Sequence, residues 1–205
     1  MYIVCSDLEG IFTPEIWINF SEITGINELR LTTRDISDYN VLMQRRLAIL
    51  RENNLKLDDI QAVIKKMEPI AGALDFLNWL RSLVEVVIVS DTYVEFAGPL
   101  MEKLGRPTLF CNTLSVNADG SISGYKLRQQ DGKKKVALAL KSLNYQVIAI
   151  GDSYNDITML QAADHAILYR PPDNVKAEYQ NFATAFTYDE LKKRLIEIMN
   201  RRNDE

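Results

Sequence analysis

Short apolar runs that alternate with helical patterns constrain the fold of this 205-residue chain more than any other feature. Four such runs are rich in Val and Ile and lack strict apolar–polar alternation, at residues 2–6, 84–90, 146–151 and 165–169. This pattern is typical of parallel strands that are covered on both faces. Helical patterns precede the second, third and fourth runs, at residues 72–83, 131–143 and 155–163. The alternation predicts an α/β fold with a doubly wound, Rossmann-like parallel sheet as its core.

Two segments interrupt this alternation. Residues 14–68 contain no convincing strand, and their apolar spacing predicts three helices, at 14–25, 38–53 and 56–67. We therefore expect a small helical cap over residues 14–68, inserted after the first strand. The α/β core then comprises residues 1–13 and 69–205. Within it, residues 107–127 predict a short antiparallel excursion with its turn at 117–120.

The charge balance limits the kinds of partner that we expect. The chain has 24 Lys and Arg against 28 Asp and Glu, a net charge of −4, so bulk charge does not attract it to nucleic acid or anionic lipid. No segment approaches the ~20 apolar residues of a membrane span. The start MYIVCSD lacks the pattern of a signal peptide. We expect a cytoplasmic protein that acts on small molecules, and nothing in the sequence predicts its oligomeric state.

Acidic and hydroxyl residues come directly after three of the predicted strands. They are Asp7 and Glu9 after the first, Ser90, Asp91 and Thr92 after the second, and Asp152, Asn155 and Asp156 after the third. Each group alone is more often a turn or a helix cap. Ligands of open parallel sheets, however, bind beyond the carboxyl ends of the strands, so the joint pattern predicts one shared site. Clustered carboxylates repel one another, and their oxygen atoms suit Mg²⁺.

Three motifs in this order resemble those of the haloacid dehalogenase-like phosphatases. DLEGIFTP at 7–14 is similar to their first motif, DxDGT, and VIVSDT at 87–92 to their second, an apolar strand ending in Ser or Thr. GDSYND at 151–156 is similar to their fourth, GDxxxD. The resemblance implies Mg²⁺-dependent phosphoryl transfer through an aspartyl-phosphate. Asp7 would be the nucleophile, and Glu9, where the family usually has Asp, the general acid and then the base.

The resemblance also implies a set of residues for the metal and the phosphate. Mg²⁺ would be bound by Asp7, by Asp152 and by the backbone carbonyl of Glu9. Asp156 would hold these ligands in place without binding the ion. Phosphate contacts would come from the second motif, Ser90 and Asp91, and from a lysine. Three lysines are available, Lys133, Lys134 and Lys135, and Lys133 matches best by spacing. The alternative is a solvated basic patch, although cations at a helix start are unfavourable unless an anion binds there.

Within these enzymes the chain most resembles the phosphoserine phosphatase family, and especially the variant also described as phosphoserine:homoserine phosphotransferase. The features are the small helical cap, Glu15 soon after the first motif, and Arg46 on a cap helix. The resemblance implies that Glu15 binds the substrate ammonium and Arg46 its carboxylate, with Asn155 also at the substrate. From the residues alone, Glu15 could merely complement a helix dipole. Arg46 falls within an apolar stripe, where an arginine requires an anionic partner.

Other functions stay open on the sequence alone. One is a phosphatase for another small phosphate ester, such as a sugar or nucleotide phosphate, and another is a non-catalytic anion-binding module. Asp91 departs from the Ser-Gly-Gly that many phosphoserine phosphatases have in the second motif. Its negative charge is compatible with an acceptor that bears an amino group, such as homoserine.

Overall fold

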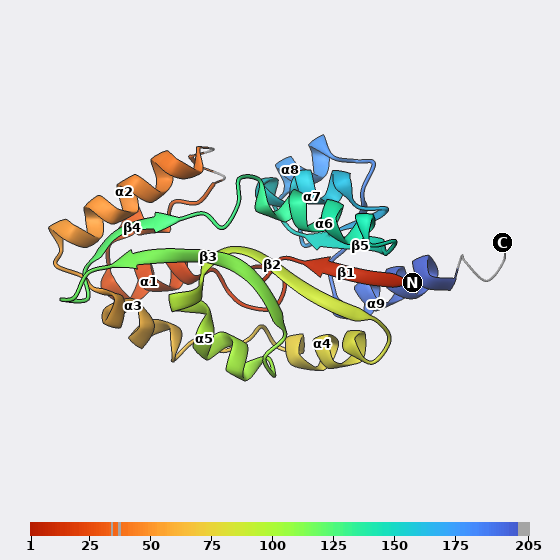
Figure 1. Cartoon of the computed structure of the whole chain (residues 1–205), viewed down its shortest axis with the longest axis horizontal. Helices are drawn as coiled ribbons and strands as arrows, with labels where there is room; N and C mark the ends of the chain where they lie inside the picture. The colour runs from red at the N-terminus through yellow and green to blue at the C-terminus, as the bar shows by residue number, and fades with distance from the viewer. Residues whose placement is uncertain (34, 37, 201–205) are drawn as a thin grey trace.

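A seven-stranded sheet forms the centre of the computed structural model, which describes residues 1–33, 35–36 and 38–200. The strand order is β4-β3-β2-β1-β5-β6-β7, and Figure 1 labels the strands from β4 to β5. The strands are β1 (Tyr2–Ser6), β2 (Glu85–Tyr93), β3 (Thr108–Val116), β4 (Ile122–Lys126), β5 (Gln146–Gly151), β6 (His165–Tyr169) and β7 (Ala183–Ala185). All neighbours pair in parallel except β3 and β4, which are antiparallel. This confirms the predicted α/β fold.

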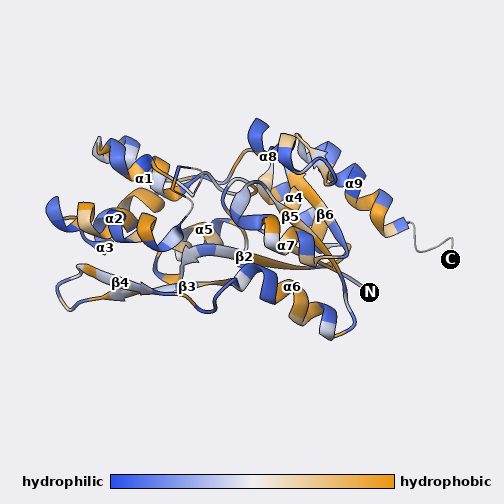
Figure 2. Cartoon of the chain, turned by 90° about the horizontal axis from the view of Figure 1, so that it is seen from above, coloured by the Kyte–Doolittle hydropathy of each residue, from blue (hydrophilic) through white to orange (hydrophobic). Residues whose placement is uncertain are grey.

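Helices cover both faces of the sheet. The helices of this part are α4 (Ala73–Arg81), α5 (Val94–Lys103), α6 (Gly132–Ser142), α7 (Ile157–Ala162), α8 (Asp173–Glu178) and α9 (Tyr188–Asn200), with a short 3₁₀ turn η2 (Tyr154–Asp156) before α7. Val4 packs with the α4, α5 and α9 side, whereas Cys5 packs with the α6, α7 and α8 side. Both are fully buried, which explains why the strand sequences are apolar without alternation. In Figure 2 the orange colour of β6 marks this apolar character.

The segment predicted to be a cap is helical over its described residues. It contains α1 (Ile16–Thr24), the 3₁₀ helix η1 (Asn27–Arg30), α2 (Tyr39–Glu52) and α3 (Leu57–Ile64). The β3–β4 hairpin packs against these helices, and β4 lies beside α2 (Figure 1). Near the tip of the hairpin, the Leu57 N–H donates a hydrogen bond to the Gly120 carbonyl at 3.0 Å. Lys56 Nζ donates to the Asp119 carbonyl at 2.9 Å. The division into cap (14–68) and core (1–13, 69–205) remains a prediction.

Several details differ from the predicted elements. Strand β2 continues to Tyr93 because Tyr93 still pairs with Asn112 of β3, so Ser90, Asp91 and Thr92 lie within the strand rather than after it. Helix α1 begins at Ile16 instead of Pro14, and Glu15 is its N-cap residue. Helices α5, α8 and α9 and strand β7 were not predicted. Among the described residues, no helix combines the length and apolar character that a membrane span requires.

Candidate active site

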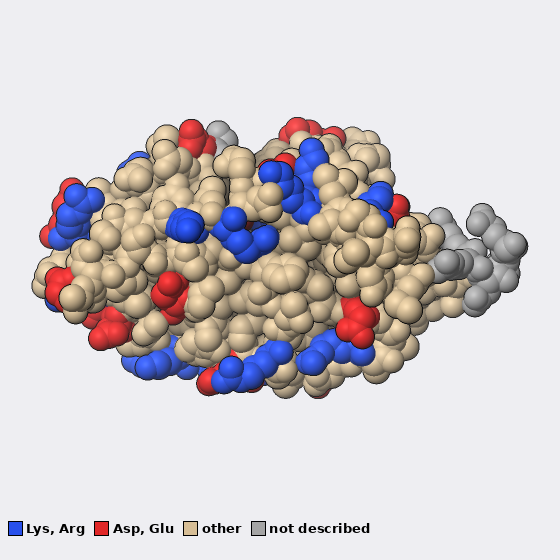
Figure 3. Space-filling view, viewed as in Figure 1, with Lys and Arg blue, Asp and Glu red and all other residues tan. Residues whose placement is uncertain are grey.

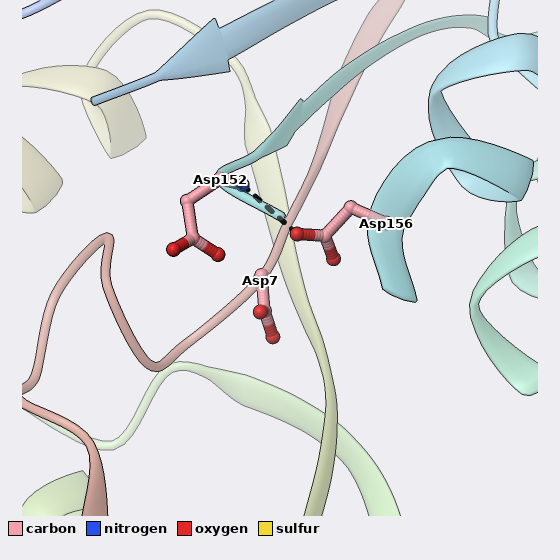
Figure 4. A group of neighbouring side chains, drawn as sticks. All are labelled: Asp7, Asp152 and Asp156. Atoms are coloured by element: carbon pink, nitrogen blue, oxygen red, sulfur yellow. Dashed lines mark hydrogen bonds between the residues drawn. The ribbon is translucent and has the colours of Figure 1, made fainter. Parts of the chain in front are cut away.

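Three buried carboxylates lie together at the carboxyl ends of β1 and β5. The carboxylates of Asp7, Asp152 and Asp156 face one another in Figure 4, and one oxygen of each lies within 4.8 Å of the others. Asp7 is held at the end of β1 by its N–H, which donates to the Ile150 carbonyl of β5 at 2.9 Å. The parallel pairing of β1 with β5 therefore unites the first and fourth sequence motifs, which are far apart along the chain.

Two glycines permit the close approach of these acids. Gly10 has φ +80°, and a Cβ there would lie 2.7 Å from Asp152 Oδ2. A Cβ on Gly151 would collide with the Asp156 side chain at its Cβ. Any larger residue at either position must displace a carboxylate of the cluster. Gly10 of the first motif and Gly151 of the fourth are therefore required sterically, because a side chain at either position would clash with a carboxylate of the cluster.

Asp156 anchors the loop that carries Asp152. One of its oxygens accepts the backbone N–H groups of Asp152 at 2.9 Å and Ser153 at 3.2 Å (Figure 4 draws the first). The other oxygen accepts from Lys133 Nζ at 2.7 Å. Asp156 thus directs both of its carboxylate oxygens to protein groups, and its predicted supporting role behind Asp7 and Asp152 remains a prediction.

Lys133 is the cation that faces the acidic cluster. Its Nζ lies 2.7 Å from Asp156 Oδ1, 3.0 Å from Asp7 Oδ1 and 3.6 Å from Asp91 Oδ2, and the residue is only 4% exposed. Burial alone would lower the pKa of Lys133, but the surrounding carboxylates raise it above its ordinary value. Lys134 and Lys135 are exposed on the first turn of α6. Of the three lysines, the structure places Lys133 beside the predicted nucleophile.

The electrostatic environment of Asp7 opposes its ionisation. Burial, followed by the negative charge of Asp156, raises the pKa of Asp7, while Lys133 acts in the opposite direction and Asp152 adds to the increase. Positive charge placed beside these carboxylates would favour the ionised form of Asp7.

The second motif lies beside this cluster. Asn155 Nδ2 donates to Asp91 Oδ2 at 3.1 Å, so the Asp91 carboxylate is turned to Asn155 and Lys133. The Asp91 carbonyl accepts the hydroxyl of Tyr39, on α2, at 3.1 Å. Ser90 Oγ accepts the backbone N–H of Thr92 at 3.2 Å, which leaves its own hydroxyl proton available for a ligand. The predicted roles of Ser90, Asp91 and Asn155 remain predictions.

A small cavity of about 70 Å³ adjoins the cluster and contains the predicted substrate residues. The residues that line this cavity include Asp7, Glu9, Glu15, Arg46, Thr92, Tyr93 and Asp152. Glu9 Oε2 accepts the N–H of Ile16, the first residue of α1, at 2.9 Å. Burial, and after it the negative charge of Glu15, raises the pKa of Glu9 to about 8. Glu9 is therefore a carboxyl group that can retain a proton near neutral pH.

Arg46 of α2 and Glu15, the N-cap residue of α1, both line this cavity. The Arg46 guanidinium lies 4.5 Å above the Trp17 ring, and its Nη2 donates to the Leu31 carbonyl at 2.8 Å. Its Nε is buried and has no hydrogen-bond partner among the described residues. Glu15 makes no side-chain capping bond to α1, so capping does not explain it. An arginine and a glutamate held in one cavity can bind a group of each charge.

Sequence reasoning missed some residues of the site. Trp17 and Tyr39 were not predicted as site residues, yet Trp17 packs against the Arg46 guanidinium, and the Tyr39 and Tyr93 hydroxyls lie 2.7 Å apart beside the cavity. Only tertiary contacts reveal these roles.

A second cavity of about 460 Å³ shares Tyr39, Ser90, Asp91 and Asn155 with the first and is also lined by residues 127–132. Figure 3 shows this face, with a notch between the lobe of α2 and that of α6 to α8.

Comparison with known proteins identifies the class to which this site belongs. Residues 13–164 match the haloacid dehalogenase-like hydrolase family. The chain belongs to this family of hydrolases, as its three motifs predicted.

Two relatives match nearly the whole chain. A phosphoserine phosphatase of Pseudomonas syringae pv. tomato is 55% identical over 199 residues, which cover 97% of this chain and 84% of the relative. Phosphoserine phosphatase ThrH of Pseudomonas aeruginosa is 51% identical over 201 residues, which cover 98% of each chain. A solved structure of a phospho-aspartyl intermediate analogue of phosphoserine phosphatase aligns with a TM-score of 0.74 and 19% identity, covering 96% of this chain and 98% of that one. It shares the fold.

Proposed function

We propose that this hydrolase removes the phosphoryl group of O-phospho-L-serine, with Mg²⁺ as its cofactor. The main support is that the cavity beside Asp7 contains Glu9, Glu15 and Arg46. These residues offer a proton donor, an anion for an ammonium group and a cation for a carboxylate. Phosphoserine carries an ammonium and a carboxylate group beside its phosphate. The two Pseudomonas relatives, both named phosphoserine phosphatases, support the same substrate.

The donor set fits Mg²⁺. Asp7, Asp152 and Asp156 place one carboxylate oxygen each within 4.8 Å of the others, and such oxygens are the ligands that Mg²⁺ prefers. Among the described residues, Lys133 is the only cation within ion-pair distance of these carboxylates. Asp7, Asp152 and the backbone carbonyl of Glu9 would hold the ion. When bound, Mg²⁺ would reduce the repulsion between carboxylate and phosphate and stabilise the charge on the phosphoryl oxygens.

The first chemical step uses Asp7 and Glu9. An oxygen of Asp7 attacks phosphorus, and the bond from phosphorus to the serine oxygen breaks on the opposite side. Glu9 gives its proton to the departing oxygen, so serine leaves as a neutral alcohol. The products are the aspartyl-phosphate of residue 7 and an ionised Glu9.

The second step reverses these roles. The Glu9 carboxylate takes a proton from water, and the oxygen of that water attacks phosphorus from the side that serine left. The bond between phosphorus and Asp7 breaks, inorganic phosphate is released, and Glu9 is again protonated. One carboxyl group can serve both steps because its pKa, raised to about 8, lets it both hold and release a proton near neutral pH.

Residues of the second motif and α6 would bind the phosphoryl group. Ser90 and Lys133 can donate hydrogen bonds to its oxygens. The Asp91 carboxylate repels a phosphate, so we assign it an indirect part, the orientation of Lys133 and Asn155, with which it interacts at 3.6 Å and 3.1 Å. Asn155 would in turn contact the substrate with its remaining amide groups.

Transfer to homoserine is a second proposed activity. Homoserine has the ammonium and carboxylate groups of serine and one additional methylene before its hydroxyl. Glu15 and Arg46 could therefore hold it as they hold serine, with its hydroxyl in the place of the attacking water.

A panel of phosphate esters assayed with Mg²⁺ tests the substrate. We expect phosphoserine to give the highest kcat/KM, well above sugar and nucleotide phosphates. A flat profile, or a preferred ester without the amino acid head group, would contradict the proposal. Addition of homoserine should divert product from inorganic phosphate to phosphohomoserine.

Trapping of the phosphoryl-enzyme tests the chemistry and the alternative of a non-catalytic anion-binding module. Wild-type protein given phosphoserine that is labelled in its phosphoryl group should become labelled, and the Asp7→Asn variant should not. Asp156→Asn is a useful comparison because it removes charge from the same cluster without removing the nucleophile. If Asp7→Asn still hydrolyses phosphoserine, the aspartyl-phosphate mechanism is wrong.

A further inference from the structure

Thr92 is a buried polar residue of the substrate cavity to which the proposed mechanism gives no part. It lies near the end of β2, is 5% exposed and lines the cavity with Glu9, Glu15 and Arg46. Its backbone N–H donates to Ser90 Oγ. Its side-chain hydroxyl has no hydrogen-bond partner among the residues that the structure describes. A buried hydroxyl without a partner is unfavourable, so a ligand that satisfies it gains affinity.

A second buried group without a hydrogen-bond partner among the described residues is the Nε of Arg46, a residue that also lines this cavity. The guanidinium can only donate, whereas the hydroxyl can donate or accept. A carboxylate can satisfy both groups, because one of its oxygens can accept from the Arg46 Nε and the other from the Thr92 hydroxyl, whereas an ammonium group cannot accept from Arg46.

We propose that Thr92 is a specificity-determining residue whose hydroxyl donates a hydrogen bond to the carboxylate that Arg46 binds. This inference rests on the proposed amino acid substrate. Arg46 supplies the charge, and Thr92 supplies a directed neutral donor from the strand that also carries Ser90. A site built to hydrogen-bond a group rejects analogues that lack it, because its buried donors then stay unpaired.

The chain offers a matched control in Thr13. Thr13 is buried as well, and its hydroxyl also lacks a partner among the described residues, but it does not line the cavity. Thr→Val removes the hydroxyl at either position and keeps the branched shape. In the free enzyme both changes should leave the melting temperature unchanged or raise it, because each removes an unpaired buried polar atom. Only Thr92→Val should alter substrate selection.

Two substrates separate the carboxylate from the rest of the ligand. O-Phosphoethanolamine keeps the phosphate and the ammonium group of phosphoserine and lacks the carboxylate. We expect Thr92→Val to raise KM for phosphoserine about tenfold, the loss typical of a hydrogen bond to a charged group. KM for phosphoethanolamine should change less than about twofold. Thr92→Ser should retain the wild-type values, and Thr13→Val should do the same.

The outcomes distinguish this inference from the proposed function. If wild-type enzyme does not prefer phosphoserine to phosphoethanolamine, sugar and nucleotide phosphates, both are overturned. If wild type prefers phosphoserine and Thr92→Val keeps the full preference, the part assigned to Thr92 is wrong and the proposed function stands. Equal losses on both substrates, or loss in Thr92→Ser as well, would show that Thr92 acts on the fold of the site and would also overturn it.

Discussion

Lys133 and Asp7 form a buried ion pair, with 3.0 Å between Nζ and Oδ1. Asp156 shares the same ammonium group at 2.7 Å, so Lys133→Met leaves a cluster of acids without their protein cation. We expect kcat/KM to fall at least about 100-fold, because a preorganised donor to the phosphoryl group is lost. Loss of one partner from a buried pair costs about 3–5 kcal/mol, so the melting temperature should also fall.

Lys134→Met provides the matched control for this change. Lys134 is the next residue on α6 and is exposed, so the substitution removes the same charge from the same helix turn without touching the acids. Activity and melting temperature should stay close to wild type. A similar loss in both variants would mean that the net charge of this helix end matters rather than the contact with Asp7.

Removal of divalent metal should abolish activity, and Mg²⁺ should restore it. Binding to the folded state alone also stabilises the protein, by about 2.7 kcal/mol when the free ion is at 100 times its Kd. For a chain of this size that corresponds to a rise in melting temperature of about 5–10 °C. Asp152→Asn should abolish most of the rise. A melting temperature that does not respond to Mg²⁺ in the wild-type enzyme would argue against a metal site at these acids.

The pH profile should report the proton on Glu9. The first step needs Glu9 protonated, and its pKa is raised to about 8 by burial and by Glu15, so kcat/KM should decline as the pH rises past about 8. Glu15→Gln removes a neighbouring negative charge, which lowers the pKa of Glu9 and moves this limb to lower pH. Glu22→Gln, an exposed change on the same helix, should leave the limb in place. An unmoved limb in Glu15→Gln would exclude Glu9 as the titrating acid.

The strands of the sheet centre could be predicted because their residues are buried on both faces. Val4 and Cys5 point to opposite faces, and both are fully buried, so the apolar run has no gap. Strand β7 has only three residues, Ala183–Ala185, too few to produce a pattern. Helix α9, by contrast, carries buried leucines four residues apart, Leu191 and Leu195, a signal that the sequence contained.

The acids of the site could be predicted because each follows an apolar strand. The buried position of Arg46 could also be predicted, since it lies within an apolar stripe of α2. The parts of Thr92 and Trp17 could not, because their neighbours in the site come from distant segments. Even the strand end was misplaced at Ser90, since pairing between Tyr93 and Asn112 of β3 extends β2 beyond the apolar run.

Gly10 should not tolerate a side chain. In Gly10→Ala the new Cβ would lie 2.7 Å from Asp152 Oδ2, and φ of +80° is unfavourable for alanine. Gly25→Ala is the matched control, because Gly25 has φ +72° and a methyl group there would have nothing within 4 Å. Both variants should lose about 1–2 kcal/mol of stability from backbone strain. Only Gly10→Ala should also lose most of its activity and its stabilisation by Mg²⁺. Equal activity in the two variants would show that Asp152 can move without consequence.

Tyr188 connects the C-terminal helix to the loop that carries Glu9. Its hydroxyl donates to the Ile11 carbonyl at 2.7 Å, and its ring is stacked between Phe76 and Tyr169, with centroids 4.9 Å and 5.3 Å away. Because packing holds the ring, Tyr188→Phe removes the hydrogen bond and little else. We expect a loss of about 1 kcal/mol of stability and a severalfold lower kcat, since the loop is less firmly positioned.

Tyr2→Phe tests whether this effect is specific to the loop. The Tyr2 hydroxyl donates to the Ile198 carbonyl at 3.1 Å, which is also a contact with α9, but it lies at the start of β1 and away from the cavity. This variant should lose a similar amount of stability and keep the wild-type kcat. Urea unfolding and steady-state kinetics measure the two quantities separately. If kcat falls equally in both variants, general loosening of α9 rather than the position of residues 7–13 limits catalysis, and Tyr188 has no special link to Glu9.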